Sequence, residues 1–440
     1  MAPKLRSWLG LFAVILAGPA FGQGVDLTDS IKPGDLCKYE IALTVEGKLK
    51  VERDGKPAAL PLTAKASHAF VERVESVDAR GGVGFAVRYY MTAASESDVA
   101  AERSKRDLGA DRRLVVALRT AEGSLHYSPD GPLYREELEL VAEHFDTLCL
   151  AALLPGKTVN PGDTWPIAAE AAQHACLFEG LIKSELVGKL TEVKENVATF
   201  TITGTAEGIE SGAQARVSVI ATGTFDATAR RITGLTWEQT DFRSQGPASP
   251  AAEVKATVTL KRSVAAEEPK ELNAEARVKV PADGKPTGVM MALRYADAAG
   301  RYQFAYPRDW HVVGRTKDHL MIRLLDKGEF AAQATITTWK KADPGMHTAP
   351  DEFKKVLAML PGWEPDVAEE GLVPTDAGRW IYRLAARGKQ DGVAVAQTFF
   401  LLAGPNGDQV AITFLAALEK AGKIGTRDLE LVNAIEFPKK

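Results

Sequence analysis

The side chains best suited to catalysis or metal binding are the histidines and cysteines, and their spacing fits no established motif. No two histidines have the i, i+4 spacing of a zinc-protease helix, and no Cys-x-x-Cys is present. The nearest arrangement is His174-Ala175-Cys176, in which an imidazole beside a thiol could bind a metal or activate the thiol. The same tripeptide is more often structural, because short motifs recur by chance. The other histidines are His68, His126, His144, His311, His319 and His347.

Motifs for nucleophilic and phosphate chemistry are missing as well. The sequence has no Gly-x-Ser-x-Gly elbow, and Leu154-Pro155-Gly156-Lys157-Thr158 lacks the first glycine of a P-loop. Paired carboxylates occur at Glu136-Glu137 and Glu369-Glu370, but neighbouring positions on a helix point apart. We therefore expect a noncatalytic protein with no catalytic residues, no bound metal and no cofactor.

Three cysteines, Cys37, Cys149 and Cys176, allow one disulfide and leave one thiol over. Cys149 and Cys176 flank the same loop region, so we favour them as the pair if the chain reaches an oxidising compartment. The alternative is three buried, inert thiols, because free cysteine is among the most buried residue types.

Aromatic side chains could line a groove for a sugar or a lipid, or they could fill the cores of sheets. Core packing is the commoner use of large aromatic residues. Tyr306 and Trp310 lie beside a predicted turn and are our candidates for an exposed contact pair. The other tryptophans considered are Trp165, Trp237, Trp339, Trp363 and Trp380.

The N-terminus has the pattern of a cleavable signal peptide over residues 1–22. Lys4 and Arg6 precede an apolar stretch from Trp8 to Ala17, and Ala20-Phe21-Gly22 places small residues two apart, which predicts cleavage before Gln23. The apolar stretch is about half the roughly 20 residues that span a bilayer. An uncleaved anchor is the alternative. We expect a secreted or periplasmic protein without a transmembrane span after cleavage.

Length and charge narrow the classes of partner. Removing 22 of the 440 residues leaves a chain too long for one core, which favours two or three domains. Loss of Lys4 and Arg6 takes the formal charge from −4 to −6. A mildly acidic chain lacks the basic face that nucleic acid requires. We expect no nucleic-acid partner, and an unidentified protein or an apolar small molecule instead.

Residues 23–262 predict a β-rich domain. Tyr39–Val51 alternates apolar and polar residues, which is the period of a half-buried strand. One helix is expected from Pro132 to Leu153, ending at Pro155-Gly156. Further strands are expected at 82–91, 114–118, 184–191, 197–204, 213–226, 231–243 and 253–262.

A faint repeat suggests that this domain has two halves, starting near residues 32 and 160. Lys32-Pro33-Gly34-Asp35 recurs as Asn160-Pro161-Gly162-Asp163. Both copies predict a type II turn, in which proline presets φ and glycine supplies a positive φ.

The remaining chain predicts a linker over 263–290 and an α+β domain over 291–440. The linker is charged and poor in apolar residues, so it is not expected to bury enough surface to order itself. Strands are expected at 301–306, 311–313, 320–325, 333–339, 379–386, 393–403 and 409–416, with helices at 349–360 and 426–435.

The segment Arg301-Tyr302-Gln303-Phe304-Ala305-Tyr306-Pro307-Arg308-Asp309-Trp310, with Asn433-Ala434-Ile435-Glu436-Phe437 near the end, resembles the PsbP-like family. The resemblance covers about a third of the chain. It implies an α/β/α sandwich and a noncatalytic accessory or binding domain. It carries no catalytic residues over to this sequence.

The N-terminal region resembles exported β domains related to lipoprotein carriers. The resemblance rests on Pro161-Gly162-Asp163-Thr164-Trp165, Gly223-Thr224-Phe225-Asp226 and Ile232-Thr233-Gly234-Leu235. It implies a curved antiparallel sheet, or half-barrel, that wraps around a packed helix. The order of elements differs from that of a plain carrier.

Three functions follow as expectations. The first is an exported noncatalytic protein that binds or scaffolds a partner at the cell envelope. The second is a carrier whose curved sheet holds an apolar ligand or lipid. The third is an enzyme whose residues converge from distant parts of the sequence.

Overall fold

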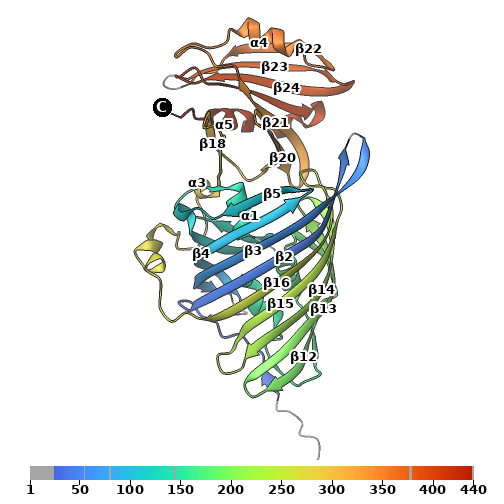
Figure 1. Cartoon of the computed structure of the whole chain (residues 1–440), viewed down its shortest axis with the longest axis vertical. Helices are drawn as coiled ribbons and strands as arrows, with labels where there is room; N and C mark the ends of the chain where they lie inside the picture. Colours follow the sequence, from blue (N-terminus) through green and yellow to red (C-terminus); the bar gives the residue numbers. More distant parts are fainter. Residues whose placement is uncertain (1–23, 54, 79–80, 143–144, 376–378, 439–440) are drawn as a thin grey trace, which may run out of the picture.

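The computed structural model describes residues 24–53, 55–78, 81–142, 145–375 and 379–438. The predicted signal peptide and His144 lie outside these residues. An elongated molecule results, with the C-terminal part stacked on one end of a large N-terminal sheet (Figure 1). No helix in the described part of the chain is long and apolar enough to cross a membrane.

The N-terminal part is built around one 13-stranded antiparallel sheet, in which the main path runs β10-β12-β13-β14-β15-β16-β2-β3-β4-β6-β7. Two more strands pair beside this path, β11 with β13 and β5 with β4. The strands are β2 (Leu36–Arg53), β3 (Lys56–Val77), β4 (Val83–Val99), β5 (Glu102–Asp107), β6 (Leu114–Thr120), β7 (Gly123–Tyr127), β10 (Thr164–Pro166), β11 (Gly180–Ser184), β12 (Val187–Lys194), β13 (Val197–Glu210), β14 (Ala213–Asp226), β15 (Arg231–Arg243) and β16 (Ala251–Val264).

Alternating residue types give this sheet one buried face. In β14 every second side chain from Ala213 to Phe225 is buried, while Gln214, Arg216 and Ser218 between them are exposed. Successive side chains on a strand point to opposite faces, so this pattern fixes which face meets the core. Figure 1 shows the long strands crossing the body obliquely in a twisted, curved layer.

The repeated turns are confirmed and begin the two halves of the sheet. Gly34 and Gly162 have φ values of +93° and +98°. Asp35 N donates to Lys32 O and Asp163 N to Asn160 O, both at 3.0 Å, as a type II turn requires. Strands β2–β7 follow the first turn and β10–β16 the second, and β16 pairs with β2 where the halves meet.

Short helices, and not one long helix, cover the buried face. The predicted helix over 132–153 is wrong: the chain forms β8 (Leu133–Tyr134), α1 (Arg135–Val141) and the 3₁₀ helix η2 (Thr147–Leu153). The Asp146 carboxylate accepts from Leu148 N at 2.9 Å, which caps a new helix and explains the break. A further helix, α2 (Ala169–Ala175), packs beside η2.

The predicted linker is held against the sheet. It contains η3 (Lys270–Leu272), η4 (Ala276–Lys279) and the start of α3 (Gly288–Met291). Leu272 is fully buried in a cluster with Phe85 and Val116, and Tyr127 Oη donates to Gly284 O at 2.9 Å. These contacts order a segment that we expected to bury too little surface.

The C-terminal part has a seven-stranded sheet with one helix on each face. Helix α4 (Pro350–Leu357) packs on Phe399 and Leu401, whereas α5 (Arg427–Ala434) packs on the side of Phe400 and Leu402 (Figure 1). The order is β19-β20-β21-β25-β24-β23-β22, and η5 (Leu418–Lys423) follows β25. The strands are β19 (Trp310–Arg315), β20 (His319–Asp326), β21 (Glu329–Trp339), β22 (Trp363–Leu372), β23 (Trp380–Gln390), β24 (Val393–Ala403) and β25 (Gln409–Ala417).

A three-stranded sheet joins the two parts. Strand β17 (Leu293–Ala296) pairs in parallel with β8 and antiparallel with β18 (Gln303–Tyr306). The Arg308 guanidinium donates to His126 O at 2.8 Å, and Arg135 donates to Trp310 O at 2.8 Å. A further two-stranded sheet pairs β1 (Val25–Asp26) with β9 (Thr158–Val159).

Tyr306 and Trp310 are buried, so our expectation of an exposed aromatic pair is wrong. Their relative exposures are 2% and 0%. Tyr306 ends β18 opposite Leu293, and the Trp310 ring lies 6.0 Å from that of Phe414. The turn between them lies at the junction of the two parts, where both rings are enclosed.

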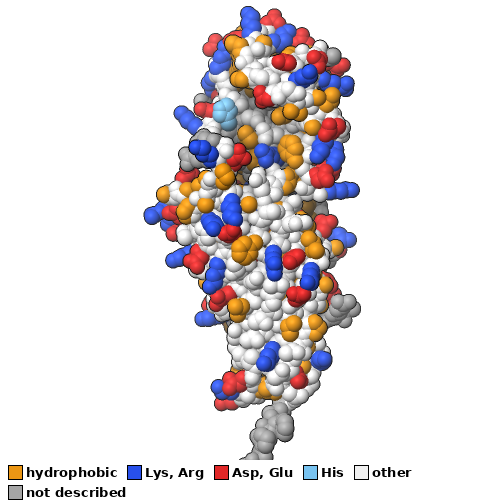
Figure 2. All heavy atoms as spheres, turned by 90° about the vertical axis from the view of Figure 1, so that its right-hand side faces the viewer, with side chains coloured by type: hydrophobic (Ala, Val, Ile, Leu, Met, Phe, Trp, Pro, Cys, Tyr) orange, Lys and Arg blue, Asp and Glu red, His pale blue; other side chains and the backbone are white. Residues whose placement is uncertain are grey.

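Charged side chains of both signs are interspersed on the surface in Figure 2. Many form ion pairs along neighbouring strands, for example Lys255 with Glu238 at 3.2 Å. The face in this view carries no extended area of one sign.

Candidate ligand cavity

A cavity of about 580 Å³ lies between the buried face of the N-terminal sheet and the short helices that cover it. Its volume is within the range of about 300–1,000 Å³ that is typical of small-molecule sites. The sheet supplies most of the lining through residues of β2, β3, β4, β14, β15 and β16. The helices supply Glu139, Ala142, Cys176 and Leu177.

The floor of the cavity is apolar, because inward-facing residues of three adjacent strands line up in register. Val45 of β2 lies opposite Ala64 of β3, and Leu43 lies opposite Ala66. On the other side of β2, β16 contributes the side chains of Ala252 and Val254. Hydrophobic residues at alternate positions thus meet as cross-strand pairs on one face.

Gly47 lets the backbone of β2 pass close to β16 in the middle of this floor. A Cβ atom at this position would lie 2.2 Å from the carbonyl oxygen of Glu253. Only glycine fits there without moving the strand. The residue is in register with Val254 on one side and Leu62 on the other, so it leaves a gap between two apolar side chains.

Polar groups stand at the two sides of the apolar floor. Ser95 and Ser97 of β4 lie on one side, and Gln239, Asp241 and Arg243 of β15 lie on the other. The three β15 residues occupy alternate positions, so all three face the cavity.

Only one of the two carboxylate oxygens of Asp241 has a hydrogen-bond partner within the part of the chain that the structure describes. Gln239 Nε2 donates to its Oδ2 at 3.0 Å, but its Oδ1 is buried and has no hydrogen-bond partner among the described residues. In the sheet it lies between Val217 of β14 and Val254 of β16. Burial raises the pKa of Asp241 to about 6, and the charge of Glu210 acts in the same direction. A carboxylate in this setting is available to a ligand that donates a hydrogen bond.

Leu177 forms part of the opposite wall and has an unusual backbone conformation. It ends α2 with φ +57°, where Leu177 N donates to His174 O and Phe178 N donates to Gln173 O. This is the Schellman motif, whose left-handed position normally holds glycine. A leucine here costs about 1 kcal/mol or more in backbone strain, and its side chain separates two cavities.

The second cavity, of about 180 Å³, is polar. It is lined by Arg88, Ser124, His126, Asp146 and His174, among others. Ser124 Oγ donates to Asp146 Oδ2, and His174 Nδ1 approaches the same oxygen at 3.5 Å. Burial opposes ionisation of Asp146, but the close approach of His174 and the hydrogen bond from Ser124 lower its pKa to about 2.

These residue types match those of a serine hydrolase, but their connections do not. A nucleophilic serine needs an imidazole that accepts its proton. Here the Ser124 hydroxyl donates to a carboxylate. Burial and the charge of Arg88 lower the pKa of His126 to about 3. Ser124 and His126 are thus not connected as a nucleophile and its base in this structure.

Arg88 is the centre of this buried network. Its guanidinium donates to Glu72 at 2.8 Å and to Thr147 Oγ1 at 2.6 Å, and it lies 3.3 Å from His126 Nε2. Burial acts to lower the pKa of Arg88, but the charge of Glu72 outweighs it and raises the pKa. The network thus ties β3 and β4 to η2.

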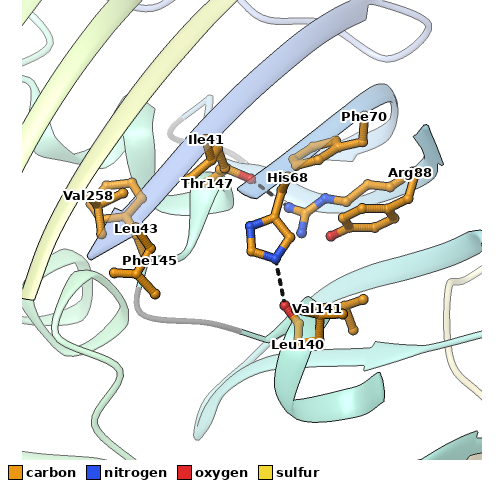
Figure 3. Close-up of a pocket in the computed structure, with 11 residues that line it drawn as sticks. Ile41, Leu43, His68, Phe70, Arg88, Leu140, Val141, Phe145, Thr147 and Val258 are labelled. Atoms are coloured by element: carbon orange, nitrogen blue, oxygen red, sulfur yellow. Dashed lines mark hydrogen bonds between the residues drawn. The ribbon is translucent and has the colours of Figure 1, made fainter. Parts of the chain in front are cut away.

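A third cavity, of only about 30 Å³, is also lined by Arg88, together with His68 and Phe70 (Figure 3). His68 points from β3 toward the helices, with Nε2 2.9 Å from Leu140 O (Figure 3). Burial lowers the pKa of His68 to about 4, so this imidazole is neutral at pH 7. The volume suits a water molecule and is too small for a larger ligand.

The three cysteines are buried free thiols, so the disulfide that we favoured between Cys149 and Cys176 is not formed. Cys149 Sγ donates to Asp146 O at 2.9 Å within η2, which turns it toward its own helix. Cys176 lines the large cavity, and burial raises its pKa to about 12.

His174 and Cys176 are not brought together as a metal pair or an activated thiol. His174 lines the polar cavity beside Asp146, whereas Cys176 lines the large one. Among the residues that the structure describes, no three His, Cys, Asp or Glu side chains are grouped to hold a metal ion.

Sequence reasoning missed Asp241, although a signal was present. Leu235, Trp237, Gln239 and Asp241 occupy alternate positions of a strand that we predicted with the correct bounds. Side chains two positions apart on a strand lie on the same face, so Gln239 and Asp241 lie on the face that buries Leu235 and Trp237. A polar residue at a core position of a strand is the exception that marks a candidate site.

Comparisons with known proteins give only distant likenesses. No protein-family model and no curated protein matches the chain. CyanoP, the PsbP of Synechocystis sp. PCC 6803, is 18% identical over 35% of this chain and 98% of its own, with a TM-score of 0.27. This solved structure is the counterpart of the PsbP-like resemblance in the sequence.

Two other solved structures are also similar to parts of this chain. A protein of Bacteroides thetaiotaomicron is 13% identical over 34% of this chain, with a TM-score of 0.26. Lipovitellin is 9% identical over 54% of this chain, with a TM-score of 0.30. The chain spans 50% of the first protein and 26% of the second. At these values the likenesses say nothing about what the chain binds.

Proposed function

We propose that this chain is an exported, noncatalytic binding protein that holds an apolar ligand in the large cavity. The observation that carries the proposal is the cavity itself, of about 580 Å³, with a floor of aligned aliphatic and alanine side chains. Small-molecule sites are typically concave, with a mainly apolar lining and a few polar groups, and this cavity has that composition. An apolar ligand would cover the aliphatic floor, with the polar side chains at its edges.

The expected affinity follows from the apolar surface that the ligand buries. A chain of about ten methylene groups contributes about 8 kcal/mol at 0.8 kcal/mol for each group. The loss of translational and rotational freedom offsets at least half of this. At most about 4 kcal/mol remains, so a chain of this length is expected to bind with a dissociation constant of roughly a millimolar, and longer chains more tightly.

In this proposal the curved sheet acts as a half-barrel that encloses the ligand. The predicted signal peptide supports a secreted or periplasmic location. No nucleic acid and no cofactor has a role in it.

The test blocks the cavity from within. Ala64→Trp places an indole in the floor, between Val45 and Ser97. Thr63→Trp is the matched control, because Thr63 precedes Ala64 on β3 and is exposed on the opposite face. Delipidated mature protein is titrated with N-phenyl-1-naphthylamine, an uncharged probe that fluoresces in apolar surroundings.

Wild-type protein and the Thr63→Trp variant should bind the probe with one saturable site. The Ala64→Trp variant should bind at least tenfold more weakly while keeping the denaturation midpoint of the control. Equal binding by both variants, or no binding by the delipidated wild type, would overturn the proposal.

A further inference from the structure

The polar side of the cavity identifies the class of ligand. Asp241 lies among apolar neighbours, in the same row as Val217 and Val254. One of its carboxylate oxygens is buried without a partner among the described residues. The other accepts from Gln239, which in turn accepts from Trp237 Nε1 at 2.7 Å. This chain of hydrogen bonds fixes the direction of the carboxylate, which lines the cavity and has only one of its two oxygens paired among the described residues.

We propose that the cavity selects amphiphiles whose apolar chain ends in a hydrogen-bond donor, an ammonium or a hydroxyl group, and that the Asp241 carboxylate accepts from this group. The inference rests on the proposed function and names the class of ligand for the same cavity. Buried polar atoms are nearly always paired, so a free acceptor in an apolar wall is where a ligand group is expected.

The two guanidinium groups beside the cavity are paired with carboxylates, which argues against an anionic ligand. Arg243 donates to Glu210 and to Pro250 O at 3.4 Å, although its Nε is buried without a partner among the described residues. Arg106 is paired with Glu139 at 2.9 Å. Lys65 also lines the cavity but is exposed to solvent, which screens its charge. A carboxylate-ended chain would therefore meet the like charges of Asp241 and Glu210 beside guanidinium groups that these or other carboxylates already neutralise.

The charges that face Asp241 set how the selection changes with pH. Glu210 raises its pKa, Arg243 lowers it, and the thiol of Cys176 beside it is neutral at pH 7. With a pKa of about 6, Asp241 is ionised at pH 7.5 and largely protonated at pH 5. An ammonium ligand should bind more tightly as the pH rises through 6, whereas a carboxylate ligand should bind more weakly.

The experiment compares three ligands that share one chain. Dodecylamine, dodecanol and dodecanoate displace N-phenyl-1-naphthylamine from delipidated protein, below their micelle concentrations, at pH 7.5 and pH 5. The variants are Asp241→Asn, which keeps the shape of the side chain, and Asp241→Leu. Glu238→Gln is the control, because Glu238 lies on the same strand, faces outward and pairs with Lys255.

For the wild type and Glu238→Gln, dodecylamine should bind at least tenfold more tightly than dodecanoate at pH 7.5, with dodecanol between them. The difference should shrink at least threefold at pH 5. In both Asp241 variants amine and carboxylate should bind within threefold of each other at either pH.

Two results would overturn the inference. One is equal affinity of the wild type for all three ligands, and the other is an unchanged preference for the amine in both Asp241 variants. In either case the proposed function would stand, provided that Ala64→Trp still blocks all three. If none of the three ligands nor the probe binds the wild type, the proposed function fails and this inference fails with it.

Discussion

Asp241→Asn should stabilise the ligand-free protein at neutral pH. Burial raises the pKa of Asp241 from the usual 3.8 to about 6. A carboxyl group whose folded-state pKa is raised favours folding only while it is protonated, and this contribution is lost as the pH rises through 6. At about 1.4 kcal/mol for each pKa unit, ionising Asp241 in the folded protein costs about 3 kcal/mol at pH 7.5. Asparagine cannot ionise and still accepts the hydrogen bond from Gln239.

The measurement is urea denaturation of the wild type, Asp241→Asn and Glu238→Gln at pH 7.5 and pH 4. At pH 7.5 the Asp241→Asn variant should be more stable than the wild type by about 2–3 kcal/mol. At pH 4 the two should differ by less than about 1 kcal/mol, because Asp241 is then protonated in the folded state and only about half ionised in the unfolded chain. Glu238→Gln should change little at either pH. A variant no more stable than the wild type at pH 7.5 would refute the reasoning.

Three further predictions concern the buried network and the thiols. Arg88→Met should lower the free energy of unfolding by about 3–5 kcal/mol, because it leaves Glu72 buried without a counter-charge. Adding Glu72→Leu to Arg88→Met should recover at least half of that loss, as measured by urea denaturation. If the double variant instead loses the sum of the two single-variant losses, the buried ion pair is contradicted. The pKa of His126 is about 3, so below pH 6.5 the unfolded chain takes up a proton that the folded protein does not. The free energy of unfolding of the wild type should therefore fall more steeply between pH 6.5 and pH 4 than that of His126→Gln, by up to about 1.4 kcal/mol for each pH unit, and equal slopes would show that His126 is protonated in the folded state. Alkylation of denatured protein without reductant, followed by intact mass measurement, should label all three cysteines, whereas a single label would establish a disulfide.

The long strands could be predicted where their burial alternates. β14, β15 and β24 have the predicted bounds, because each carries apolar residues at every second position or in a continuous run. β3 was missed. Its first half contains Pro57, Pro61 and several alanines, which have low strand propensity, and it is held by pairing with β2 over residues 56–73. β22 was missed for a related reason, since it is an acidic edge strand that contains Pro365.

The cavity depends on contacts that one sequence does not contain. The helix expected over 132–153 breaks because Asp146 caps η2, and this break makes the covering layer shorter and more irregular. The burial of Tyr306 and Trp310 likewise depends on the pairing of β17 with β8, which are more than a hundred residues apart in the sequence. Asp241 lies beside Val217 and Val254 because of the register in which β14, β15 and β16 pair. No local sequence pattern specifies that register.

Native mass spectrometry of the mature protein, gently purified from the exporting cell, tests the central claim most directly. The account predicts that wild-type protein and Thr63→Trp carry an additional mass, released on unfolding, that belongs to an amphiphile with an amine or hydroxyl end. Ala64→Trp prepared in the same way should carry none. The same additional mass on Ala64→Trp, or ligand-free wild type that takes up none of the three dodecyl compounds, would contradict it.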